Sequence, residues 1–119
     1  MRPVHWVASS KKDLREFPEP VKDVIGRSLL DVQFGDKPQN ATPLRGFDGA
    51  GVLELIEDHD GATYRAVYTV KFAGAVYVLH CFQKKSKRGI ATPRHDIELI
   101  RERLAAAELD WKRRRGELN

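Results

Sequence analysis

The sequence has one cysteine, no long hydrophobic run and no recognisable secretion signal. Cys81 alone cannot form an internal disulfide or a multi-cysteine zinc site. No apolar run approaches the roughly 18 residues that span a bilayer, and residues 1–6 lack the apolar core of a signal peptide. These absences predict a cytoplasmic protein with no membrane partner.

The sequence also lacks the short motifs of several common enzyme classes. It has no glycine-rich phosphate loop, no H-E-x-x-H and no G-x-S-x-G, so P-loop nucleotide hydrolysis, zinc proteolysis and α/β-hydrolase chemistry are excluded. The four histidines fall in different predicted elements without the spacing of metal ligands. We therefore expect no metal and no cofactor. The histidines are His5, His59, His80 and His95.

Basic residues exceed acidic ones by 21 to 17, which gives a formal net charge of +4. The excess is concentrated in an acid-free stretch within residues 84–94 and in a run at residues 112–115. A charge run near the end of a chain is usually a solvated tail. The 84–94 stretch is therefore the better candidate for contact with a polyanion.

The 119 residues fit one domain, residues 1–119, with the element order β-α-α-β-β-β-α. That order predicts an α+β fold whose mostly antiparallel sheet carries its helices on one face. Residues 35–51 are rich in turn formers and predict a loop, with Leu44 and Phe47 reaching the core. Gly26 lies inside a helical pattern, which suggests that something approaches it closely. Strands are expected at residues 4–7, 52–57, 64–72 and 75–83, and helices at residues 10–17, 20–34 and from 92–93 to about 111.

The strands at residues 64–72 and 75–83 are expected to form a hairpin through Ala73 and Gly74. A two-residue turn places Thr69 opposite Val78, Val67 opposite His80 and Arg65 opposite Phe82. Three polar residues then share one face of the sheet, which the predicted one-sided helix packing leaves free. A turn of odd length would swap the faces of one strand. The three residues are Arg65, His80 and Lys84.

Two of these residues admit two interpretations each. An arginine at the centre of a strand needs an anionic partner, which is either Glu54 or Glu57 across the hairpin or a bound phosphate. His80 is either a strand histidine with satisfied hydrogen bonds or part of an active site.

Three segments of the sequence resemble one toxin superfamily. They are Tyr64-Arg65-Ala66-Val67-Tyr68, the strand and loop from Tyr77 through Phe82-Gln83-Lys84-Lys85-Ser86, and Thr92-Pro93 before the last helix. With Leu44-x-Gly46-Phe47 and Ser10 to Leu14, they look like the RelE/ParE superfamily, and closely like its phage-derived, HigB-type branch. The resemblance implies a RelE-like fold and a type II toxin whose partner is a helix-turn-helix antitoxin.

The resemblance also implies a chemistry. Toxins of the RelE and HigB type cut messenger RNA on the ribosome without a metal, the ribose 2′-hydroxyl attacking the adjacent phosphate. On that pattern Arg65, Lys84 and Lys85 match catalytic cations, and His80 or His95 could transfer a proton. The neighbouring basic residues are expected to bind RNA. These are Lys87, Arg88 and Arg94.

The sequence departs from the RelE pattern at two places. Glu54 and Glu57 stand in the strand where RelE-type toxins carry lysines, and no tyrosine lies near the start of the last helix. The alternative is therefore a non-enzymatic module of the same fold, either a ParE-like gyrase poison or a domain that only binds an antitoxin.

Overall fold

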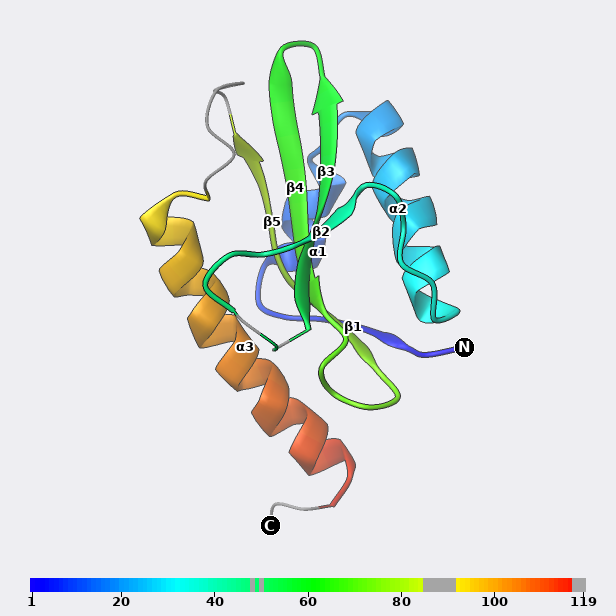
Figure 1. The fold of residues 1–119 in the computed structure, drawn as a ribbon, viewed down its shortest axis with the longest axis vertical. Helices are drawn as coiled ribbons and strands as arrows, with labels where there is room; N and C mark the ends of the chain where they lie inside the picture. Colours follow the sequence, from blue (N-terminus) through cyan, green and yellow to red (C-terminus); the bar gives the residue numbers. More distant parts are fainter. Residues whose placement is uncertain (48, 50, 85–91, 117–119) are drawn as a thin grey trace.

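The computed structural model describes residues 1–47, 49, 51–84 and 92–116 (Figure 1). A five-stranded sheet has the order β1-β5-β4-β3-β2, with β1 parallel to β5 and the other neighbours antiparallel. The expected order of elements is confirmed, with one further short strand, β2, inside the predicted loop. The elements are β1 (Val4–Trp6), α1 (Ser10–Arg15), α2 (Glu19–Gln33), β2 (Ala41–Pro43), β3 (Val52–His59), β4 (Ala62–Thr69), β5 (Val76–Lys84) and α3 (Arg94–Arg114).

Helices cover both faces of the sheet, so the expectation that they lie on one face is wrong. In Figure 1, α2 and α3 lie on opposite sides of the strands. One core joins α1 and α2 to one face, and a second core joins α3 to the other. The physical reason lies in β4, where every residue from Thr63 to Thr69 is buried. A strand buried on both faces needs a layer on each side, because its side chains alternate between them.

The helix α2 shows how the sequence pattern builds the first core. Its buried apolar residues recur at helical spacing, and the chain leaves the helix at Gly35, where φ is +94°. The suggestion that something packs closely on Gly26 is wrong, because a Cβ built there meets nothing within 4 Å. The buried apolar residues are Val21, Ile25, Leu29 and Val32.

The segment between α2 and β3 reaches the second core, as expected. Leu44 and Phe47 are both buried and pack in the cluster that contains Ile100 of α3. Among the helices that the structure describes, none combines the length and the apolar character needed to cross a membrane.

Candidate functional site

The hairpin of β4 and β5 brings the candidate site residues to one face through a bulge. Residues 70–75 form a longer connection than the predicted two-residue turn, so Thr69 pairs with Tyr77 and the predicted pairing with Val78 is wrong. A register shift between Tyr68 and Val67 then restores the predicted pairs of Val67 with His80 and of Arg65 with Phe82. Lys84 pairs with Thr63 further along. The predicted shared face of Arg65, His80 and Lys84 is confirmed, but it is the face that α3 packs on.

Arg65 forms a buried ion pair with Glu54 on the neighbouring strand β3. Its Nη1 atom lies 3.0 Å and 3.2 Å from the two carboxylate oxygens of Glu54. The two residues are only 3% and 5% exposed. The sequence left two kinds of partner open for Arg65, a carboxylate across the hairpin or a bound phosphate. The structure shows the carboxylate, which belongs to Glu54 and not to Glu57.

The carboxyl group of Glu54 has an unusual environment. Burial raises its pKa above the ordinary value, because desolvation outweighs the opposing effects of Arg65 and of Lys84. A carboxyl with a raised pKa beside fixed cations is suited to take up a proton. From the sequence, Glu54 was named as a possible ion-pair partner of Arg65 and as a departure from the RelE pattern, but not as a site residue. Its expected place on the strand next to Arg65 was the signal that could have identified it.

His80 uses both ring nitrogens within the protein. Its Nε2–H donates to the Asp96 carboxylate at 2.7 Å, and its Nδ1 lies 3.3 Å from Nη1 of Arg103. Since the carboxylate only accepts and the guanidinium only donates, these partners assign the neutral ring with its proton on Nε2. Burial lowers the pKa of His80, and Arg103 adds to this effect while Asp96 opposes it.

The partners of His80 connect three elements of the fold. Arg103 of α3 also donates to the Leu79 carbonyl at 2.9 Å and to Ser9 Oγ at 3.2 Å, just before α1. The ring of His80 stacks on Phe82 with centroids 4.7 Å apart. Of the two interpretations of His80, this geometry fits the strand histidine whose hydrogen bonds are satisfied within the protein. The hydrogen bonds of His80 and Arg103 connect α3 and the start of α1 to β5.

Of the remaining candidates, two are exposed, Lys84 is half-buried, and three lie outside the described residues. Arg94 and His95 lie exposed on the first turn of α3, where Arg94 pairs with Glu98 at 3.2 Å. Lys84 ends β5, close enough to Glu54 to lower the pKa of that carboxyl. Three predicted residues lie outside the described residues: Lys85, Lys87 and Arg88.

The described side chains include no group of three histidine, cysteine, aspartate or glutamate residues able to hold a metal ion. Glu54 can accept a proton, and Arg65 and Lys84 supply positive charge on the same side of the sheet.

Comparison with known proteins identifies the family and the fold. The family model described as phage derived protein Gp49-like (DUF891) matches residues 12–105. The crystal structure of the isolated Escherichia coli RelE toxin matches with 17% identity and a TM-score of 0.56, covering 86% of this chain and 98% of that one. That likeness shows a RelE-like α+β fold.

A second solved structure is more distant. The toxin-antitoxin complex RelBE2 from Mycobacterium tuberculosis matches with 17% identity and a TM-score of 0.49, covering 70% of this chain and 98% of that one. No curated protein sequence matches the chain.

Proposed function

The chain belongs to the phage-derived Gp49-like family, and from that membership and its RelE-like fold we propose that it is a type II toxin that cuts messenger RNA. The observation that carries the proposal is the buried pair of Glu54 and Arg65 beside Lys84. It combines a proton acceptor with fixed cations, which are the groups that metal-independent cleavage of RNA requires.

The proposed reaction assigns one role to each group. Glu54 takes the proton of a ribose 2′-hydroxyl, and the oxygen attacks the adjacent phosphorus. The bond from phosphorus to the 5′-oxygen breaks, leaving a 2′,3′-cyclic phosphate, and His95 on the exposed first turn of α3 protonates the departing oxygen. Arg65 and Lys84 stabilise the negative charge on the phosphorane.

The ion pair couples the proton transfer to stabilisation of the phosphorane. While Glu54 is ionised, it neutralises Arg65 at 3.0 Å. Once Glu54 has taken up the proton it is neutral, and the guanidinium charge becomes available to the phosphate as that group gains charge. Because Arg65 is buried in the free chain, we propose that cleavage needs the ribosome to expose the pair to bound mRNA.

His80 is a positioning residue in this proposal rather than a catalytic one. Both of its ring nitrogens are already bonded, and its contacts with Asp96 and Arg103 fix the first turns of α3 against β5. This anchoring sets where Arg94 and His95 stand. We further propose that Arg94 and the undescribed Lys85, Lys87 and Arg88 contact the RNA backbone, and that a helix-turn-helix antitoxin is the protein partner.

Cleavage in a translating bacterial extract tests the proposal. Primer extension on the mRNA should show new 5′ ends with the wild-type protein and none with Glu54→Gln, which keeps the shape and some hydrogen bonds of Glu54. Lys11→Ala, an exposed change on α1, is the matched control and should cleave normally.

The same buried pair also favours a second candidate, a non-enzymatic module of this fold. Arg65, Glu54 and His80 all have hydrogen-bond partners within the protein, so none of them needs a catalytic role to explain its position. Intact transcripts in the extract would contradict the nuclease proposal. If DNA supercoiling were inhibited at the same time, the protein would be a gyrase poison. If neither occurred, antitoxin binding would remain as its function.

A further inference from the structure

The edge strand β1 has an unpaired side. It lies at the end of the sheet order, and its neighbour is β5 alone. Val76 donates to the Pro3 carbonyl and Val7 donates to the Val78 carbonyl, each at 2.9 Å, so residues 3, 5 and 7 direct their backbone groups toward β5. Because these groups alternate along a strand, Val4 and Trp6 direct theirs outward. No strand of the described chain pairs with that outer edge.

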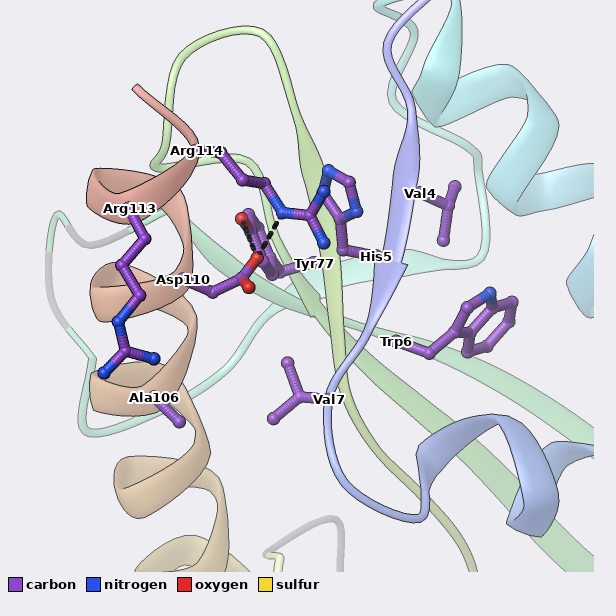
Figure 2. A pocket seen from close by; sticks show the side chains of 9 residues that line it. All are labelled: Val4, His5, Trp6, Val7, Tyr77, Ala106, Asp110, Arg113 and Arg114. Carbon is purple, nitrogen blue, oxygen red and sulfur yellow. Dashed lines mark hydrogen bonds and ion pairs between the residues drawn. The ribbon is translucent and has the colours of Figure 1, made fainter. Parts of the chain in front are cut away.

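A cavity of about 470 Å³ opens beside this edge, on the face that α3 covers (Figure 2). β1 forms one wall, and the last turns of α3 form the wall opposite. Its lining residues include His5, Tyr77, Asp110, Arg113 and Arg114.

The cavity has a surplus of positive charge. Asp110 is already bound, because Arg114 donates to its carboxylate at 2.6 Å and the Tyr77 hydroxyl donates to it at 2.7 Å. Arg113 is exposed and makes no salt bridge to any residue in the described ranges. Burial lowers the pKa of His5, aided by Arg114, so that ring is neutral near pH 7. One arginine charge is therefore left for a ligand.

We infer that the outer edge of β1 binds an extended, acidic segment of a partner protein. The segment adds to the sheet as a sixth strand through the backbone groups of Val4 and Trp6. Its side chain beside His5 lies over the cavity, because neighbouring residues on adjacent strands share a face. A glutamate or aspartate at that position reaches Arg113, with which it is complementary in charge.

The observations favour a peptide over a nucleic acid at this surface. The two outward N–H and two outward C=O groups match the main-chain spacing of a strand, which RNA does not offer. A second cavity near the start of β1 is lined by Arg2 and by Phe34, which is 65% exposed. An apolar side chain of the added segment can cover that ring, whereas a phosphate cannot.

The inference goes beyond the proposed nuclease and does not depend on it. The cavity lies at the C-terminal end of α3, and Arg94 and His95 lie at the start of that 21-residue helix. At about 1.5 Å per residue, the two ends are roughly 30 Å apart. A ligand at one end therefore leaves the other free.

Binding of a defined probe tests the charge component. The probe is a fluorescein-labelled peptide of alternating valine and glutamate, titrated with the full chain and followed by fluorescence anisotropy. Arg113→Glu should weaken binding by about tenfold or more, because it reverses the charge that the glutamates meet. Lys11→Glu makes the same change in charge on an exposed site of α1 and should alter the affinity less than about twofold.

A second probe tests the backbone component without altering the protein. The same peptide with alternate N-methylated amides cannot pair along the edge and should lose about tenfold or more in affinity. Equal affinity for both peptides, or an unchanged affinity of Arg113→Glu, would overturn the inference. So would single-stranded RNA competing with the peptide for the Arg113 site, or a dimer of the free chain that closes this edge. Since no ribosome is present, failure here leaves the nuclease proposal standing.

Discussion

Replacing Arg65 by methionine removes the hydrogen-bonded counter-charge of the buried Glu54 carboxylate. Both groups are almost inaccessible, at 3% and 5% exposure, and they meet at 3.0 Å. Removing one partner of such a buried pair costs about 3–5 kcal/mol of unfolding free energy, because the remaining charge keeps its desolvation cost. A domain of this size is stable by about 5–15 kcal/mol, so the loss is a large share of the total.

The loss should be visible in both thermal and chemical unfolding. At about 4 °C per kcal/mol, the melting temperature should fall by about 12–20 °C. Urea unfolding followed by circular dichroism at about pH 7.5 gives the free energy directly. Arg94→Met, which removes an arginine with a 92% exposed side chain, is the control and should leave stability unchanged.

A double variant and a change of pH separate the ion pair from simple loss of packing. Arg65→Met with Glu54→Leu should recover most of the stability, since the uncompensated charge is gone. The pKa of Glu54 is raised on folding, so the folded state holds more protons than the unfolded state above about pH 4.5. The destabilisation in Arg65→Met should therefore shrink as the pH is lowered toward 5. A cost below about 1 kcal/mol at pH 7.5, or a double variant no better than the single, would refute the reasoning.

Three further predictions follow from other parts of the fold. The pKa of His80 is lowered on folding, so the unfolded state binds more protons below about pH 6.5, and stability should fall as the pH drops through that value. His80→Gln should reduce this slope in urea titrations, and an equal slope would contradict the assignment. Gly26→Ala should raise the unfolding free energy by up to about 1 kcal/mol in the open helical site, whereas Gly51→Ala, at φ +63° against the Lys71 backbone, should lower it by about 1–3 kcal/mol. Calorimetry on both variants gives the sign. Truncation after Trp111 should leave most of the salt dependence of RNA binding in anisotropy titrations, at a slope near 0.7 per phosphate contact. Removing the charges of the 84–94 stretch should abolish most of this salt dependence. If the salt dependence is instead lost with the tail, RNA binds at the tail and the prediction is wrong. The charges to remove are Lys84, Lys85, Lys87 and Arg88.

The local periodicity of the sequence was enough to predict most elements of the fold. The alternation around Tyr64 to Phe72 predicts a central strand, and the spacing of Val21, Ile25 and Leu29 predicts α2, because each pattern depends only on backbone geometry. The segments around Arg65 and Phe82 carried the family resemblance. These features are local, so they could be read without knowing what each element packs against.

The second face of the sheet and the partners of the site residues were decided by tertiary structure. Arg65, His80 and Lys84 were expected on a free face of the sheet, but that face carries the second core, in which residues of α3 pack. Whether Arg65 meets Glu54 or Glu57 depends on the register of β3, and whether His80 faces α3 depends on one bulge in β5. Asp96 and Arg103 become partners of His80 only when α3 docks. Contacts of this kind join residues far apart in the chain, so local propensity does not encode them, and the packing of the whole domain selects them.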